Sequence, residues 1–322
     1  MKKFLFILLI TLCGIKVSAQ QDAQFSQYMF NGLYINPAYA GYHEAWNVHA
    51  FYRNQWSSFP GAPKTFSVAA DGNLKNERVG LGIQVMNDKL GASNNTSLYG
   101  TYAYRFPVNE EGDHRLSIGI SAGFVQQHMD LSKLSPTSTA LDPVLVNGRK
   151  DAMLPDARVG IYYNTEKWFA GFSANNLFTH AFQKSDALKE YLPLKPHLYF
   201  TLGGIFPVSE QLKLKPSLLV KEDMAGPTSI DINAMGLIQE KLWVGISYRS
   251  AYLKRNNLQD GLQQPSAMVF MADFIVSEKL RIGYAYDKTI NSTVANNAPT
   301  NEISLGYYFR HKDGRVISPK YF

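Results

Sequence analysis

The sequence predicts an all-β fold, a transmembrane antiparallel up-and-down β-barrel of about 14 strands. Three observations lead to this prediction. Apolar and polar residues alternate with a period of two in many successive runs, the connections between the runs alternate between short and long, and an export signal precedes them all. In bacterial barrels of this kind the short turns face the periplasm and the longer loops face the outside of the cell.

Residues 1–19 have the three parts of a secretory signal peptide. Lys2 and Lys3 form a positive start, a run from Phe4 to Leu12 is apolar except for Thr11, and Val17-Ser18-Ala19 is a small-residue cleavage site. We therefore expect cleavage after Ala19 or Gln20. Two alternatives are weaker. A membrane anchor needs about 20 apolar residues, and this run is too short. Lipidation of Cys13 usually requires a small residue before the cysteine, and Leu12 is large.

The composition excludes several classes of protein. Of the 322 residues 45% are hydrophobic and 13% aromatic, which is too many for a disordered chain. The single cysteine lies in the signal peptide, so the mature chain can form no internal disulfide. The formal charge of +6 includes Lys2, Lys3 and Lys16, and the remaining +3 is too small to indicate a nucleic-acid partner.

Alternation is clearest in residues 242–249, where Leu242, Val244, Ile246 and Tyr248 alternate with Trp243, Gly245, Ser247 and Arg249, which apart from the tryptophan are small or polar. Successive side chains of a strand point to opposite faces, so such a run is apolar on one face only. Runs of this kind predict strands near residues 46–56, 65–72, 78–87, 95–106, 114–128, 155–164, 168–177, 196–206, 211–221, 228–238, 242–250, 266–275, 280–287 and 301–310.

The connections between these runs form two sets. The short set lies at residues 109–112, 165–167, 209–211, 239–241 and 277–279, and the long set at residues 130–154, 178–195, 251–265 and 288–300. A sheet that spans hydrocarbon must close into a barrel. An even number of strands places the N-terminus and the C-terminus of the chain on the same side of the membrane. We therefore expect a barrel at residues 46–310, a periplasmic N-terminal segment at residues 20–45 and a periplasmic tail at residues 311–322.

The two faces of the predicted strands differ in chemistry. The apolar face carries aromatic residues that could form a girdle at the lipid boundary, namely Tyr102, Tyr104, Phe106, Tyr284, Tyr286, Tyr307 and Phe309. Charged residues would point into the lumen, namely Arg53, Arg105, Arg115, Arg158, Lys213, Lys215, Asp231, Asp273 and Arg281. They would form either a salt-bridged network or a selectivity surface for a solute. A soluble β-sandwich alternates equally well, but the strand lengths and the two sets of connections favour a barrel.

Two short motifs suggest an enzyme, and neither fits its context. Gly119-Ile120-Ser121-Ala122-Gly123 spells a nucleophile elbow, which requires a strained turn from strand to helix, yet it lies inside an alternating run. His43-Glu44-Ala45-Trp46-Asn47 begins like a zinc protease helix, but Asn47 replaces the second histidine ligand. We therefore expect no catalytic site, no metal site and no cofactor.

The segment ahead of the first strand differs in kind from the rest. It contains Gln24-Phe25-Ser26-Gln27-Tyr28-Met29-Phe30-Asn31 and then Ile35-Asn36-Pro37-Ala38-Tyr39-Ala40-Gly41, where Asn36-Pro37 would break a helical turn and Gly41 permits a bend. Together with Tyr52-Arg53-Asn54-Gln55-Trp56 and Ser318-Pro319-Lys320-Tyr321-Phe322, it resembles the PorP/SprF family of type IX secretion system membrane proteins from Bacteroidota. The resemblance covers essentially the whole mature chain.

The resemblance implies a non-enzymatic protein of the outer membrane that serves secretion or surface attachment of adhesins, including those of gliding motility. Its expected partners are outer-membrane lipid and the periplasmic and secreted proteins of that machinery. The candidate partner-binding residues are Gln27, Tyr28, Asn31, Asn36, Pro37, Tyr39 and Gly41. Two other functions stay open, an outer-membrane solute channel or porin and a soluble extracellular adhesin.

Overall fold

The computed structural model describes residues 23–43, 45–74, 78–133, 148–182, 195–223, 228–252, 266–290 and 298–309. The expected signal peptide (1–19) and C-terminal tail (311–322) lie outside the described residues. Within the described part of the chain, no helix is both long and apolar enough to cross a membrane.

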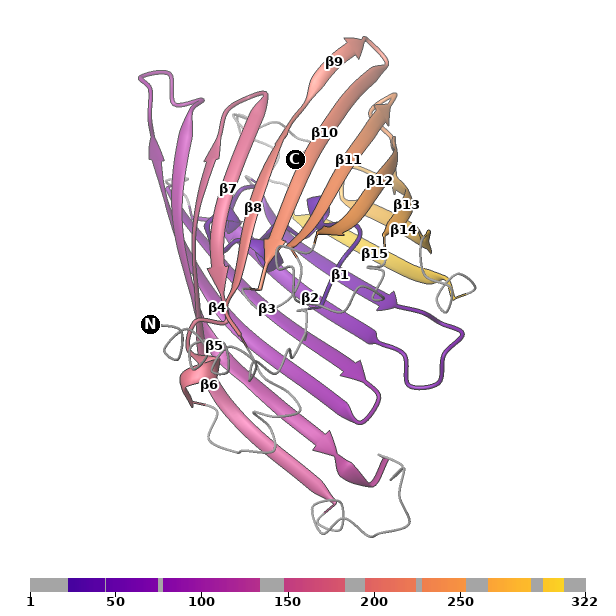
Figure 1. The fold of residues 1–322 in the computed structure, drawn as a ribbon. Helices are drawn as coiled ribbons and strands as arrows, with labels where there is room; N and C mark the ends of the chain where they lie inside the picture. Colours follow the sequence, from indigo (N-terminus) through magenta and orange to yellow (C-terminus); the bar gives the residue numbers. More distant parts are fainter. Residues whose placement is uncertain are drawn as a thin grey trace, which may run out of the picture.

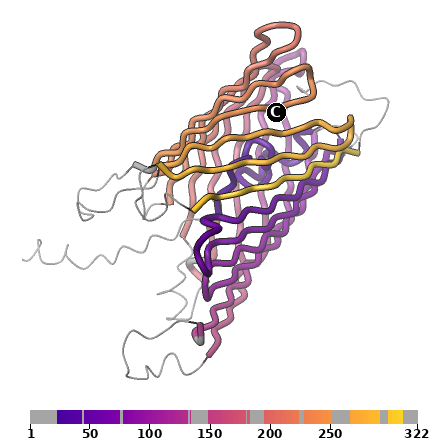
Figure 2. Tube along the Cα trace, turned by 90° about the vertical axis from the view of Figure 1, so that its right-hand side faces the viewer, coloured from indigo at the N-terminus to yellow at the C-terminus, as the bar shows by residue number. Residues whose placement is uncertain are grey.

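The described strands form one antiparallel sheet that closes into a barrel (Figures 1 and 2). They are β1 (Trp46–Asn54), β2 (Lys64–Asn73), β3 (Val79–Leu90), β4 (Ser93–Pro107), β5 (Arg115–Asp130), β6 (Arg149–Asn164), β7 (Trp168–Asn175), β8 (His197–Gly204), β9 (Phe206–Ser209), β10 (Leu212–Glu222), β11 (Thr228–Ile238), β12 (Leu242–Tyr252), β13 (Ala267–Ile275), β14 (Leu280–Thr289) and β15 (Thr300–Phe309). Short described helices are η2 (Tyr28–Phe30), α2 (Gly32–Ile35), η3 (Pro37–Tyr39), η4 (Leu131–Lys133) and α4 (Thr179–Phe182).

The number of strands agrees with the alternation in the sequence. β8 and β9 are separated only by Ile205 and both pair with β10, so they act as one strand of a 14-stranded barrel. The last strand pairs with the first, with Trp46 opposite Phe309 and Asn54 opposite Asn301. This pairing removes both sheet edges at the seam and confirms the predicted closed antiparallel barrel.

Two features of the strands differ from the predicted ones. β6 begins at Arg149 rather than near residue 155, because Pro155 stands within the strand and does not end it. β3 and β4 are joined by Gly91 and Ala92 alone, although this turn lies at the end of the barrel that carries the longer loops. Gly91 has a φ of 55°, a left-handed conformation that glycine adopts without strain and that a two-residue hairpin requires.

The outer face of the barrel is apolar and the inner face is polar. On β15, Ile303, Leu305 and Tyr307 point outward and are exposed, whereas Glu302 and Ser304 point inward and are buried. The expected girdle residues of β4, β14 and β15 also lie on the outward face. An apolar outer surface around a polar interior is the arrangement expected of a barrel whose outer solvent is lipid.

The N-terminal segment lies inside the barrel, where η2, α2 and η3 are surrounded by the strands (Figure 1). Almost every residue from Phe25 to Tyr42 is buried. We expected residues 20–45 to project into the periplasm, and residues 23–43 instead fill space within the lumen. The physical reason is that a segment so rich in Phe, Tyr, Leu and Ile gains more by burial than by exposure to water.

Closure of the seam can be tested with an engineered disulfide between β1 and β15, because the described chain contains no cysteine. Tyr52 and Ile303 lie opposite each other in the register and both face outward. We expect the pair Tyr52→Cys and Ile303→Cys to oxidise spontaneously, so that protease cleavage in a loop leaves one covalent chain on a non-reducing gel. The pair Tyr52→Cys and Leu305→Cys, displaced by two residues, is the control, and equal oxidation of both pairs would contradict this register.

Candidate functional site

The candidate site is the plug, defined as residues 23–43, together with the inward-facing residues that hold it. One carboxylate anchors its N-terminal half. The Glu302 side chain on β15 accepts hydrogen bonds from two consecutive backbone amides, Ser26 N at 2.7 Å and Gln27 N at 2.8 Å. Ser304 Oγ, two residues further along the same face, donates to Gln27 Oε1 at 2.9 Å. Because Ser26 and Gln27 are themselves only 1% and 0% exposed, water is not available to replace Glu302 as the acceptor for these amides.

A cluster of buried charges surrounds this anchor. Arg53 on β1 forms ion pairs with Asp287 on β14 at 2.7 Å and with Glu302 at 3.0 Å. Arg249 on β12 pairs with Asp231 on β11 at 3.0 Å and with Asp287 at 3.3 Å. Buried charges are tolerated when they are paired and hydrogen-bonded. These arginines and carboxylates pair with one another, although Arg53 Nε is left without a hydrogen-bond partner among the described residues.

Ser26 ties the plug directly into this cluster. Its hydroxyl donates to Asp287 Oδ2 at 2.7 Å and accepts from Arg53 Nη1 at 2.7 Å. Lys221 on β10 approaches the same cluster, with Nζ at 3.6 Å from Asp231. The cluster therefore joins strands from both ends of the sequence around one residue of the plug.

The middle of the plug is fastened to other parts of the wall. Asn233 Nδ2 on β11 donates to the Tyr28 hydroxyl at 2.5 Å. On the far side, Asn36 Nδ2 donates to the Ile161 carbonyl of β6 at 2.8 Å, and Ser173 Oγ of β7 donates to the Ile35 carbonyl at 2.6 Å. The same Asn36 accepts from Ala38 N through Oδ1 at 2.9 Å and so caps the start of η3.

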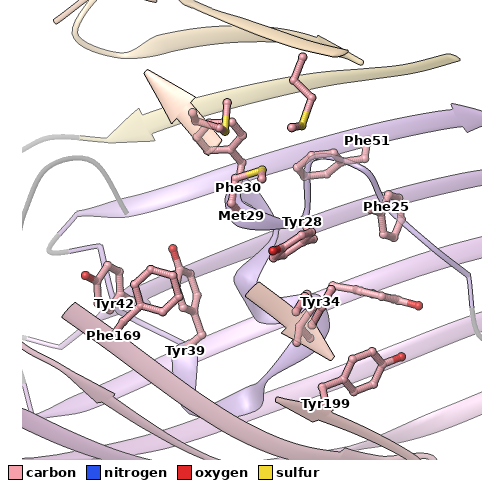
Figure 3. Close-up of a cluster of buried hydrophobic side chains, with 14 of the residues drawn as sticks. Phe25, Tyr28, Met29, Phe30, Tyr34, Tyr39, Tyr42, Phe51, Phe169 and Tyr199 are labelled. Carbon is pink, nitrogen blue, oxygen red and sulfur yellow. The ribbon is translucent and has the colours of Figure 1, made fainter. Parts of the chain in front are cut away.

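Aromatic side chains pack between the plug and the wall (Figure 3), and they leave a cavity that is bordered by Tyr39 of the plug and by Tyr162 and Phe169 of the wall. The Phe25 ring meets Tyr34 edge-on at 4.9 Å between centroids and the wall residue Phe51 at 5.6 Å. Tyr39 stacks on Tyr42 at 4.9 Å. Such contacts add to simple area burial, and they make the plug part of the core of the barrel.

Glycines on the wall leave room for the plug backbone. A Cβ atom at Gly80, Gly119, Gly160 or Gly283 would collide with the plug, at Ala40, Ala38, Asn36 and Gln27 respectively. At Gly80 and Gly119 the plug backbone itself approaches the strand, which only glycine permits, and at Gly160 and Gly283 a plug side chain occupies the space. These residues, which belong to β3, β5, β6 and β14, explain why part of the inner face is small.

The seven candidate partner-binding residues are all buried within the barrel. Gln27, Tyr28 and Asn36 bond to the wall as described, Gly41 N donates to Asp71 Oδ2 at 2.8 Å, and Pro37 and Tyr39 form η3. Asn31 closes η2 through its backbone amide, which donates to the Tyr28 carbonyl at 2.9 Å. In this structure their contacts are therefore with the chain itself, and a role in binding a partner stays a prediction.

In the structure nearly all the candidate lumen charges lie on the inner face of the barrel. The following are buried on the inner face: Arg53, Arg105, Arg115, Arg158, Lys215, Asp231, Asp273 and Arg281. Lys213 is only half-buried and pairs with Glu240 at the adjacent turn, at 2.5 Å. Sequence reasoning missed the two main anchors, Glu302 and Asp287. The sequence did hold a signal for them. In β15 and β14 each acid occupies a position that alternates with the apolar, outward-facing residues, so its side chain must face inward.

Neither enzyme-like motif forms an active site. Ser121 lies in the middle of β5 and its hydroxyl is 2.7 Å from Thr101 Oγ1 on β4. His43 is the last residue of the plug, and its Nε2 lies 3.2 Å from the Tyr39 hydroxyl. Within the described ranges, no group of three His, Cys, Asp or Glu side chains could hold a metal ion.

A closed barrel with an apolar outer face and a polar, occupied lumen defines an outer-membrane β-barrel protein. The chain belongs to the family described as type IX secretion system membrane protein PorP/SprF, whose model matches residues 17–307. Its place is therefore the outer membrane, and the family and the fold describe a component of a secretion system rather than an enzyme.

Solved structures with the same fold are distant in sequence. The CymD monoaromatic hydrocarbon channel is 12% identical, with 93% of this chain and 96% of that chain covered at a TM-score of 0.52. The toluene transporter TbuX of Ralstonia pickettii is 10% identical, with 87% and 93% covered at a TM-score of 0.51. At these identities the likeness concerns the fold alone. No curated protein matches the sequence.

The anchor at Glu302 can be tested by substitution. Glu302→Ala leaves Ser26 N and Gln27 N unpaired and removes one partner of Arg53, so we expect a loss of about 3–5 kcal/mol in the stability of the plugged barrel. The measurements are the thermal transition of the purified barrel and protease sensitivity of the plug. Glu302→Gln keeps one acceptor and should lose less. Unchanged protease resistance in Glu302→Ala would contradict this anchor.

Proposed function

We propose that this protein is a plugged, non-enzymatic outer-membrane barrel of the type IX secretion system that supports secretion or surface attachment of cargo of the adhesin or gliding type by binding protein partners. The observation that carries the proposal is the plug. A conduit needs an open lumen, whereas residues 23–43 are bonded to β6 and β7 on one side and to β14 and β15 on the other.

The manner of attachment indicates that the plug stays in place. Removing it would break the hydrogen bonds of Glu302 and Asp287 and would leave charged groups of the cluster without Ser26. Each such bond to a charged group contributes about 1.5–3 kcal/mol, and they act together. A closed barrel with longer connections at one end and short turns at the other is suited to holding partners at the membrane, with lipid around its outer face.

The rival function is that of a solute channel or porin. Its support is the shared fold with barrels named as hydrocarbon channels and transporters, which at this identity carries no function over to this chain. The charged cluster fits the interpretation as a salt-bridged network, because its members bond to one another and to the plug. The two functions differ in what they predict for conduction and for cargo.

Conductance across a planar bilayer separates the two functions. We expect the intact barrel to conduct poorly, because the plug occupies its lumen. Gly119→Leu and Gly160→Leu introduce side chains where the plug lies, so they should displace it and raise conductance. Gly100→Leu is the matched control, since Gly100 faces outward on β4 and a Cβ there meets no side chain. A large, stable conductance of the intact barrel would favour the channel.

Cargo display in the native bacterium tests the proposed function itself. A strain without the gene should lose the cargo protein from the cell surface, with accumulation in the periplasm or the medium, and the gene supplied in trans should restore it. Affinity purification from the complemented strain should recover the cargo or a machinery component with the barrel. Normal surface display in the deletion strain, measured by surface proteomics, would contradict the proposal.

A further inference from the structure

One strand of the barrel extends far beyond its neighbour at the long-loop end. β6 comprises residues Arg149–Asn164, yet β7 pairs only with Val159–Asn164. On its other side β6 pairs with β5 along its whole length, from Arg115 opposite Asn164 to Asp130 opposite Arg149. Within the part of the chain that the structure describes, no strand pairs with the first ten residues of β6 on the side where β7 ends. Figure 1 shows β5 and β6 running past the end of β7.

The backbone groups on this free edge can be assigned from Pro155. Opposite residues in an antiparallel pair alternate between hydrogen-bonded and non-hydrogen-bonded pairs. Pro155 has no N–H, so its pair with Phe124 is non-hydrogen-bonded, and the pairs of Met153 with Gln126 and of Asp151 with His128 follow the same alternation. The N–H and C=O groups of Asp151 and Met153 therefore point away from β5, toward the free edge.

The chain after β7 meets this edge only at its inner end. Leu177 N donates to the Ala157 carbonyl at 3.1 Å, as the alternation requires, and Phe178 N donates to Asp156 Oδ1 at 3.1 Å. The chain then turns into α4 (Thr179–Phe182). The edge from Arg149 to Pro155 lies beyond these bonds.

This edge also projects past the apolar band. Outward-facing residues of β5 are apolar up to Phe124 and then change to Gln126 and His128. On β6 the change comes after Met153, which is 69% exposed, with Asp151 and Arg149 beyond it. Polar outward side chains place this part of the edge in water, where a polypeptide can reach it.

We propose that the free edge of β6, residues Arg149–Pro155, binds an extended segment of a secreted polypeptide and adds it to the barrel sheet as one more strand. Edge addition uses main-chain hydrogen bonds, and a row of donors and acceptors at two-residue spacing fits an extended backbone. This inference rests on the proposed function, because it names the surface by which the barrel would hold a partner.

A second copy of this chain does not fit the edge. Strands of outer-membrane barrels are tilted by about 35–45°, so a two-fold axis along the membrane normal would make two β6 edges cross instead of aligning. An extended segment of a different polypeptide has no such constraint. Arg149 and Lys150 at the outer end of the edge favour a segment with an acidic residue there.

The test uses photo-crosslinking in the native outer membrane. A photoreactive amino acid replaces Met153 in the full-length chain, and adducts formed on illumination are identified by mass spectrometry. We expect an adduct with an extended segment of a secreted polypeptide. Asp151→Pro removes one edge N–H without disturbing β5, so it should lower the adduct about tenfold, which corresponds to the loss of about one hydrogen bond.

Asp151→Ala is the matched control. It also removes the contact of Asp151 Oδ1 with His128 Nδ1, at 2.6 Å, but keeps the N–H, so the adduct should persist. Adducts only within the same chain or with a second copy, or equal adducts in both variants, would overturn the proposal. Heat-modifiable migration on gels shows that each variant is folded. Loss of the adduct in Asp151→Pro with normal cargo at the surface would overturn the edge as the attachment surface and leave the proposed function standing.

Discussion

The rest of this structure follows from one constraint, which is that backbone polar groups cannot remain unpaired in hydrocarbon. The constraint forces the sheet to close, and here closure is achieved by pairing β1 with β15, so that segments far apart in the sequence become neighbours. Closure creates a lumen, and the strand pattern alone does not show what occupies it. Its inner face is lined by buried charges, and those charges need partners that water or the chain itself must supply.

The plug supplies many of these partners. Glu302 and Asp287 bind Ser26 and Gln27, and Arg53 links both carboxylates to the first strand. The wall adapts in return, because glycines at positions such as Gly80 and Gly119 allow the plug backbone to approach the strands. Plug and wall therefore form one core. An occupied lumen suits a barrel that holds partners at the membrane better than one that conducts solutes.

Closure does not remove every edge. Because β7 is shorter than β6, no strand of the described residues pairs with the outer part of β6 on that side, and a row of its backbone groups faces this edge beyond the apolar band. Proteins usually protect such edges, and Pro155 does so at one position by lacking an N–H. Among the described residues, the remainder of this edge is the part of the barrel best placed to contact a polypeptide outside the membrane.

By itself the sequence determined the strands, because a period of two is a local property of each run and survives any tertiary arrangement. It also determined which face of each strand meets lipid, and so placed residues such as Arg53, Arg158 and Asp231 inside the barrel. Its motifs led to the family. The importance of Glu302 could not be recognised locally, because its partners Ser26 and Gln27 are more than 270 residues away in the sequence.

Only the tertiary structure decided where the N-terminal segment lies. Its aromatic residues could have bound a partner in the periplasm or the inside of its own barrel, and both would bury them equally well. The choice depends on whether the lumen has a matching shape and charge, which exists only after the strands have closed. The free edge of β6 was likewise decided by the relative lengths of neighbouring strands, a comparison that has meaning only when their register is known.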